Sequence, residues 1–238
     1  VGALPFKMTD AQKLAAWEIL QDIAKPQPMN RLLQGDVGSG KTAVAAMAAF
    51  MAAKAGLQTA FMAPTEILAA QHAESLAKLL EPHGARIALL VGSTKSSQKN
   101  QLKNHIKNGD VDIIIGTHAL IQKDSEFKSL GLVIIDEQHR FGVQQRTELL
   151  SKGKQMPHLL SMTATPIPRS LQLTLYGELD VSVLNQMPKG RQPIATKVVS
   201  PDARYTVYEK IEAEIKSGRQ AYVVCPLVAD SEKSELKS

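Results

Sequence analysis

The sequence predicts an α/β domain in which a parallel sheet carries helices on both faces. Short apolar runs alternate with helical stretches, and the runs are apolar throughout rather than at every second residue. Such strands are typical of parallel sheets that are buried between helices. A glycine-rich loop also joins the first apolar run to a helix. The βαβα order further predicts that ligands bind at the carboxyl ends of the strands.

Six strands and six helices are expected in this first domain, residues 1–186. The strands are expected at Leu32–Gln34, Thr59–Ala63, Ile87–Val91, Asp112–Gly116, Leu132–Asp136 and His158–Met162. The helices are expected at Thr9–Ala24, Lys41–Ala55, Glu66–Leu80, Ser96–Asn108, Val143–Lys152 and Ile167–Leu175.

A second domain is expected after residues 187–193, which are rich in Pro and Gly and are typical of a linker. Residues 194–238 then begin a new β-α-β unit. Its elements are expected at Ile194–Val199, Ala203–Ser217 and Gln220–Leu227. Roughly 50 residues with two strands and one helix cannot bury a proper core. We therefore expect an incomplete second domain.

Composition and charge restrict the class of protein. The hydrophobic content of 44% supports a sizeable core, and the single cysteine, Cys225, excludes an intramolecular disulfide and suits a reducing cytoplasm. No apolar run approaches the roughly 18 residues of a membrane span. The N-terminus shows no secretion signal and does not begin with Met, so we expect a cytoplasmic segment of a longer protein.

A basic stretch between Arg86 and Gly109 contains five cationic residues and no acid. Its cations are Arg86, Lys95, Lys99, Lys103 and Lys107. The four lysines recur at intervals of four, which places them on one side of a helix. One interpretation is a stripe that guides the phosphates of nucleic acid. The other is a solvated helix face, with Leu102 and Ile106 pointing inward.

The glycine-rich loop predicts a nucleotide phosphate site, because it matches G-x-x-x-x-G-K-[ST] at every fixed position. It comprises Gly35, Asp36, Val37, Gly38, Ser39, Gly40, Lys41 and Thr42. Glycines let the loop curl so that backbone N–H groups face the phosphates. Lys41 supplies positive charge for the β- and γ-phosphates, and the Thr42 hydroxyl is a ligand for Mg²⁺. The N-terminus of the following helix adds partial positive charge.

Two further motifs follow expected strands. Asp136 and Glu137 end an apolar strand, where the first acid would hold Mg²⁺ and the second would orient and deprotonate an attacking water. The alternative is a surface turn, which the phosphate loop in the same sheet disfavours. Thr163 and Thr165 follow the next strand, and their hydroxyls could link the nucleotide site to a moving partner domain. A simple Thr-Pro turn is the other interpretation.

Together these motifs resemble the superfamily 2 helicases, and within them the RecG family of bacterial branched-DNA helicases. The strings that carry the resemblance are residues 33–42, 116–120, 136–143 and 163–169. The transcription-repair coupling factor is a close relative, in which Glu would be expected in place of Gln138. The resemblance covers essentially the whole chain and implies two RecA-like lobes, of which residues 194–238 would begin the second.

The resemblance also implies roles for further residues. Gln12 would read the edge of the adenine base, although Thr9 and Gln12 also match a helix capping box, and both can hold in different states. Candidates for contact with the DNA backbone are Pro64, Thr65, Gly116, Thr117 and His118. Such contacts carry no sequence code. Candidates for coupling the nucleotide to DNA are His139, Arg140, Thr163 and Thr165.

The implied cofactors are ATP and Mg²⁺, and the implied partner is branched DNA at forks and four-way junctions in recombination and repair, on the bacterial nucleoid. A single-stranded DNA-binding protein is a further implied partner. A wedge domain would precede Val1, and the rest of the second lobe, with its arginines, would follow Ser238. Because such arginines are worth roughly 10³–10⁵ in rate, we expect slow hydrolysis by this chain alone. Three alternatives remain open: a translocase of the coupling-factor type, a DNA-independent nucleotide-gated ATPase, and a DNA-binding module with a vestigial ATP site.

Overall fold

The computed structural model describes residues 6–122, 125–165, 179–188 and 194–224. The chain divides into two compact units, Val1–Arg191 and Gln192–Ser238, which are described separately below. This division lies within the expected linker at residues 187–193.

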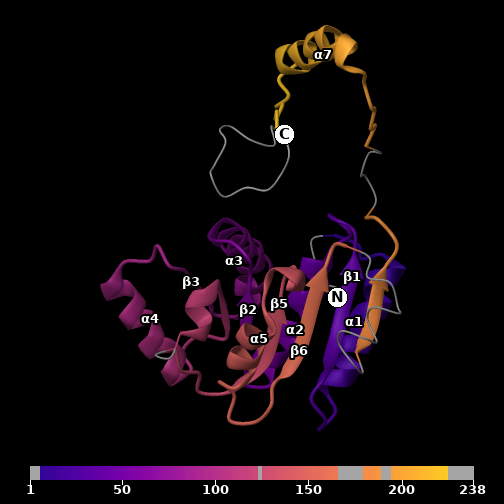
Figure 1. The fold of residues 1–238 in the computed structure, drawn as a ribbon. Helices are drawn as coiled ribbons and strands as arrows, with labels where there is room; N and C mark the ends of the chain where they lie inside the picture. Colours follow the sequence, from indigo (N-terminus) through magenta and orange to yellow (C-terminus); the bar gives the residue numbers. More distant parts are fainter. Residues whose placement is uncertain (1–5, 123–124, 166–178, 189–193, 225–238) are drawn as a thin grey trace. The chain divides into compact units, whose positions relative to one another are not determined.

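The first unit contains a seven-stranded sheet with the order β3-β4-β2-β5-β6-β1-β7 (Figure 1). Its strands are β1 (Asn30–Gly35), β2 (Gln58–Met62), β3 (Ile87–Leu90), β4 (Ile113–Gly116), β5 (Leu130–Ile135), β6 (His158–Thr163) and β7 (Asp180–Leu184). Every paired strand is parallel to its neighbour, so all the carboxyl ends lie at one edge. The six strands expected from apolar runs and the parallel arrangement are confirmed.

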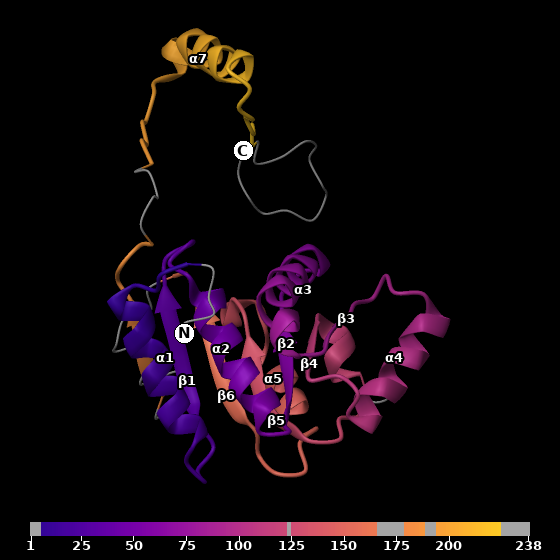
Figure 2. The same ribbon diagram turned by 180° about the vertical axis from the view of Figure 1, so that it is seen from behind.

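Helices cover both faces of this sheet, as expected. They are α1 (Asp10–Ile23), α2 (Lys41–Lys54), α3 (Glu66–Leu80), α4 (Ser96–Asn108) and α5 (Val143–Leu150). Figure 2 shows α1, α2 and α3 in front of one face. Short 3₁₀ turns are η1 (Glu81–His83), η2 (His118–Ile121) and η3 (Gln138–Arg140). The helix expected at Ile167–Leu175 lies outside the described residues. No helix in the described ranges is long and apolar enough to cross a membrane.

The core consists of two layers, one on each face of the sheet, because successive side chains of a strand point to opposite faces. In β5, Leu132 and Ile134 pack with the layer under α1, α2 and α3. Val133 and Ile135 pack with the layer that includes Leu149 of α5. Both faces of the strand are therefore buried, which is why β5 is apolar throughout.

Strand β7 was not predicted from the sequence. It pairs with β1 at the edge of the sheet, where Ser182 and Leu184 are buried while Asp180 and Val183 are exposed. An edge strand with this alternation contains no continuous apolar run, which was the signal used for the other strands.

The basic stretch on α4 is not a continuous exposed stripe. Lys103 is buried, and Lys107 forms an ion pair with Glu126 at 2.8 Å. Ile106 is buried and Leu102 packs against the same core layer, which confirms the predicted inward face. The lysines that the sequence places on one side of the helix therefore have different environments in the folded protein.

The second unit differs from the prediction. Helix α7 (Arg204–Lys216), preceded by η4 (Pro201–Ala203), confirms the helix expected at Ala203–Ser217. The prediction of a strand at Ile194–Val199 is wrong, because these residues are not in a strand. In the strand expected at Gln220–Leu227, the described residues 220–224 are not in a strand either. No strand in the described ranges pairs with either segment. Because a strand without a neighbour leaves its backbone groups unpaired, apolar residues alone do not produce one.

Candidate nucleotide and nucleic-acid site

The phosphate loop joins β1 to the first residue of α2, as its motif predicts. Gly38 has φ 79° and Gly40 has φ 89°, both in the left-handed region that favours glycine. A Cβ atom at Gly40 would also lie 2.2 Å from Gln12 Nε2. Glycine at position 40 is thus required both by the backbone angle and by the close approach of α1. Helix α2 begins at Lys41, directly after Gly40, so its N-terminal end lies at this loop.

Lys41 folds back over the loop that precedes it. Its Nζ donates to the carbonyl oxygens of Gly35, at 2.6 Å, and Asp36, at 3.2 Å. Burial lowers the pKa of Lys41, while the nearby charges of Glu137, Asp136 and Asp36 oppose that shift. A partly desolvated ammonium interacts more strongly with an anion than one in bulk water. Lys41 is therefore suited to an anionic ligand.

Asp136 follows β5 at the same edge of the sheet. Its Oδ1 accepts a hydrogen bond from the backbone N–H of Glu137 at 3.0 Å, and its Oδ2 lies 2.7 Å from Nε2 of His72. Glu137 is the one described non-glycine residue with positive φ, at φ 48° and ψ 57°. A left-handed glutamate is uncommon, and such strain occurs often at functional sites.

The loop and the two acids meet in one pocket of about 360 Å³. Its lining residues are Val37, Gly38, Gly40, Lys41, Thr42, Leu68, Asp136 and Glu137. The tertiary structure therefore brings together four side chains predicted from separate motifs: Lys41, Thr42, Asp136 and Glu137. A hydroxyl and a carboxylate are the hard oxygen donors that Mg²⁺ prefers, so the donor set fits that ion.

A larger pocket of about 1270 Å³ lies beside the loop, between α1, α3 and residues 186–188. Gln12, Gly40 and Thr42 contribute to its lining. Gln12 Oε1 accepts from Thr9 N at 2.9 Å, and Gln12 N donates to Thr9 Oγ1 at 3.2 Å, which confirms the capping box. Gln12 Nε2 also donates to the carbonyl of Ser39 at 2.7 Å. Gln12 thus connects α1 to the phosphate loop.

The end of β6 lies between the strand that carries the phosphate loop and the strand that carries the acids. In register, Thr163 pairs with Gln34 of β1. The Thr163 hydroxyl is buried, accepts from Thr165 N at 3.2 Å and lies 3.0 Å from Thr165 Oγ1. The two threonines therefore form a local bend at the carboxyl end of β6.

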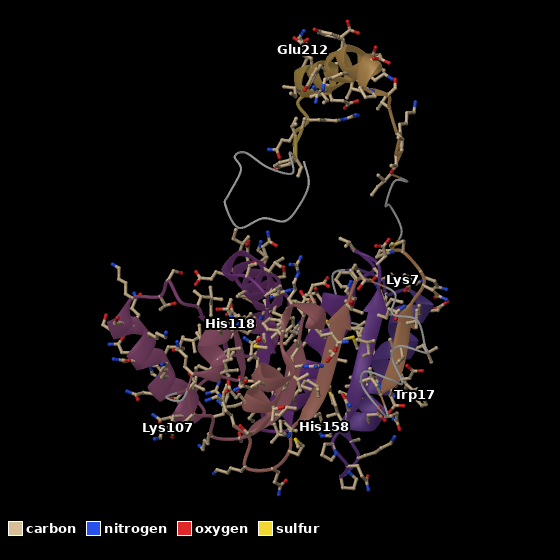
Figure 3. The ribbon with its side chains drawn as sticks, viewed as in Figure 1. Lys7, Trp17, Lys107, His118, His158 and Glu212 are labelled. Atoms are coloured by element: carbon tan, nitrogen blue, oxygen red, sulfur yellow. The ribbon has the colours of Figure 1, made fainter. Side chains whose placement is uncertain are left out.

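The residues predicted to contact DNA follow β2 and β4 at that edge. Thr65 caps α3, since its Oγ1 accepts from Leu68 N at 3.2 Å. Thr117 is buried, whereas His118 is exposed and contacts the ring of Phe141, with centroids 5.9 Å apart (Figure 3). Of the remaining candidates, Pro64 is half-buried, Gly116 is buried and Arg140 is exposed. The side chain of His139 lies outside the described residues.

The sequence reasoning missed His72. It lies on α3, seven residues after Thr65, so two helical turns separate it from the start of the helix. The strand β2, which precedes α3, pairs with β5, which precedes Asp136. That adjacency is a property of the folded sheet, and a single histidine in a helix gives no sign of it in the sequence.

Known proteins share this fold and much of this sequence. Residues 9–174 match the DEAD/DEAH box helicase family. The ATP-dependent DNA helicase RecG of Aquifex aeolicus is 52% identical over 239 residues, which cover 100% of this chain and 30% of that protein. The RecG of Bacillus subtilis is 52% identical over 100% of this chain and 35% of that protein. The chain thus spans about a third of the length of these curated relatives.

Solved structures show the same arrangement. A structure of RecG bound to a three-way DNA junction matches with a TM-score of 0.83 and 50% identity, covering 95% of this chain and 30% of that chain. A hypothetical ATP-dependent RNA helicase from Sulfolobus tokodaii, at 21% identity, has a TM-score of 0.58 over 75% of this chain and 54% of that chain and shows the fold alone. The fold is the RecA-like fold of helicase lobes, and the chain belongs to the DEAD/DEAH box helicase family.

Proposed function

We propose that this chain is the ATP-binding motor lobe of a helicase that acts on branched DNA; its relatives are named ATP-dependent DNA helicase RecG, and a similar RecG structure is bound to a three-way DNA junction. The observation that carries the proposal is the single pocket formed by Lys41, Thr42, Asp136 and Glu137 at the carboxyl edge of the sheet. About 50% identity to RecG over nearly the whole chain favours this motor over other nucleotide-binding proteins.

Residues 35–42 would bind the phosphates of ATP through the backbone N–H groups of the loop and the start of α2. Lys41 would neutralise the β- and γ-phosphates. Thr42 and Asp136 would hold Mg²⁺, and Gln12 would contact adenine from the wall of the larger pocket. Bound Mg·ATP would supply the γ-phosphoryl group, whose transfer to water releases the free energy of the cycle.

Glu137 would orient the attacking water and accept its proton. Its carboxylate belongs to the same pocket as Lys41 and Thr42. The left-handed backbone at Glu137 fixes the start of η3 at the pocket rim. That geometry supports the role of a base rather than of an ordinary surface acid.

The DNA backbone would lie along the carboxyl edge, at Pro64 and Thr65 after β2 and at residues 116–118, which begin with the last residue of β4. His139 and Arg140, together with Thr163 and Thr165, would couple these contacts to the nucleotide. Residues 194–238 would begin the second RecA-like lobe. A wedge domain and the remainder of that lobe would complete the motor in the bacterial cytoplasm, with single-stranded DNA-binding protein as a partner on the nucleoid.

Steady-state ATP hydrolysis by the full-length protein, with and without forked DNA, tests the proposal. We expect strong stimulation by a fork, weaker stimulation by linear duplex, and loss of hydrolysis in Lys41→Ala. Equal stimulation by linear duplex would favour a translocase of the coupling-factor type. Hydrolysis that ignores DNA would contradict the proposal and leave a nucleotide-gated ATPase. A gel shift that is independent of nucleotide, without hydrolysis, would indicate a vestigial ATP site.

A further inference from the structure

Helix α3 contacts both functional regions of this edge. We infer that α3 couples the predicted DNA-contact loops to the nucleotide pocket, with His72 as the positioning residue that holds Asp136 at one end and Glu66 as the link at the other. The inference rests on the proposed function, since it assigns how that motor connects DNA to nucleotide.

The nucleotide end of this connection is the pair His72–Asp136. A carboxylate only accepts, so Nε2 of His72 carries a proton and donates to Oδ2 at 2.7 Å. The two side chains are 12% and 11% exposed, so water competes little for this bond. The ring of His72 also packs on Phe61, with centroids 4.7 Å apart, and Phe61 is fully buried. The imidazole is thus fixed on one side by the core and on the other by the predicted metal ligand.

The DNA end of the connection is Glu66, the first residue of α3. Its carboxylate accepts from Ser93 Oγ at 2.6 Å and from Ser93 N at 3.2 Å. A Cβ atom at Gly92 would lie 2.8 Å from Glu66 Oε1, so the loop after β3 approaches the helix closely. Glu66 directly follows Thr65, a predicted contact with the DNA backbone. The start of α3 therefore joins two loops of the carboxyl edge.

The helix between these ends is continuous and packs on the core. His72 lies six positions after Glu66, which corresponds to about 9 Å along the helix axis. Ala69 and Leu76 are buried in the core layer beneath α3. A shift of the first turn, caused by a phosphate at Thr65, therefore moves His72 relative to Asp136. If DNA binding changes the affinity for the nucleotide through this connection, linkage requires that the nucleotide change the affinity for DNA by the same factor.

A second His–Asp pair provides a matched control. His105 Nδ1 on α4 lies 3.0 Å from Oδ2 of Asp110, which follows the helix, but these side chains are 60% and 52% exposed. The chemistry is the same as in His72–Asp136, while solvent surrounds the pair. Substitution of His105 tests whether loss of any such pair alters the motor.

The test is a coupling ratio in the full-length protein. The ratio is the Kd for forked DNA, measured by fluorescence anisotropy, without and with a non-hydrolysable ATP analogue and Mg²⁺. Coupling factors are typically about 5- to 150-fold, and we expect the unsubstituted protein to fall in this range. His72→Phe should bring the ratio close to one, whereas His72→Gln, which keeps an N–H donor, should restore most of it. His105→Phe should leave the ratio unchanged.

Glu66→Ala gives an independent arm, because Glu66 is exposed and its removal does not disturb the core. We expect it to lower the ratio also, and the double variant with His72→Phe to lower it no further than either alone. Full coupling in His72→Phe would overturn the inference and leave the proposed function intact. A second result would also overturn the inference: Glu66→Ala keeps the full coupling ratio, and His72→Phe no longer binds the nucleotide. His72 would then serve only the metal site. A ratio of one in the unsubstituted protein, with hydrolysis that ignores DNA, would instead contradict the proposed function.

Discussion

The two edges of the same parallel sheet use polar residues in opposite ways. At the amino edge, Gln58 at the start of β2 is buried and uses its whole amide within the protein. Nε2 donates to the carbonyls of Ile106 and Val111, both at 2.9 Å. Oε1 accepts from the backbone N–H groups of Lys128, at 2.8 Å, and Ser129, at 3.1 Å. One side chain thus joins three segments of the chain.

Arg31, near the start of β1, also joins separate segments of the chain, through an ion pair and a hydrogen bond. Its guanidinium lies 2.7 Å from Asp22 Oδ2 and donates to Ser182 Oγ at 3.0 Å. Burial alone would raise the pKa of Asp22, but hydrogen bonds from Lys25 and Arg31 hold that pKa below its ordinary value. These contacts fasten α1 and β7 to β1. The amino edge therefore stabilises the fold.

At the carboxyl edge, by contrast, the structure retains backbone strain at Glu137, while a buried hydroxyl without a hydrogen-bond partner in the described structure occurs at both edges, at Ser39 and at Thr59. Such strain persists where the surrounding fold enforces it, and it clusters at binding sites. The comparison indicates that contacts at the amino edge stabilise the sheet, so that residues at the carboxyl edge can serve ligand binding instead of stability.

The largest expected effect concerns rate rather than stability. Glu137→Gln at the carboxyl edge should lower DNA-stimulated ATP hydrolysis by about 10²–10⁴-fold, because the amide cannot accept the proton of the attacking water. The variant should still bind a fluorescent ATP analogue, and its melting temperature should be unchanged. Retained hydrolysis would show that another group is the base.

Gln58→Leu at the amino edge should have the next largest effect. It removes the partner of the Val111 carbonyl and of the Lys128 and Ser129 N–H groups, while the Ile106 carbonyl keeps its bond from Gly109 N. Each buried group left unpaired costs about 1–3 kcal/mol. We expect the free energy of unfolding to fall by at least about 3 kcal/mol in urea denaturation. Gln101→Leu on the exposed side of α4 is the control. If both substitutions have an equal and small effect, Gln58 does not stabilise the amino edge.

Acid should affect the amino edge through Asp22. A carboxylate whose pKa is lowered in the folded state adds stability above its unfolded pKa, about 3.8, and loses that stability as the pH falls through the lower folded pKa. Asp22→Asn should therefore destabilise the protein at pH 7, and the difference from the unsubstituted protein should shrink below about pH 4. Urea denaturation at pH 7, 4 and 3 measures this; a difference that does not change with pH would contradict it.

The smallest effect is expected at Ser39, on the carboxyl edge. Its hydroxyl makes no hydrogen bond in the described structure, so Ser39→Ala removes a buried polar atom without breaking an interaction. The free energy of unfolding should stay within about 0.5 kcal/mol or rise slightly. A loss well above that value would mean that the hydroxyl has a partner after all.

The sequence by itself determined the features that depend on neighbouring residues. Glycines at positions 35, 38 and 40 with Lys41 predicted the phosphate loop, because the left-handed angles and the following helix are local requirements. Apolar runs predicted β1 to β6 for a similar reason, since a strand buried on both faces is apolar at every position. Thr9 and Gln12 predicted the capped start of α1.

Only the tertiary structure decided which distant segments meet. Strand β7 forms because β1 presents it with an edge, whereas Ile194–Val199 is as apolar but pairs with no strand in the described chain. The burial of Lys103 and the bond between His72 and Asp136 likewise depend on packing between elements far apart in sequence. The physical reason is the same in each case: hydrogen-bond partners and neighbours are supplied by the fold, and residue type alone does not specify them.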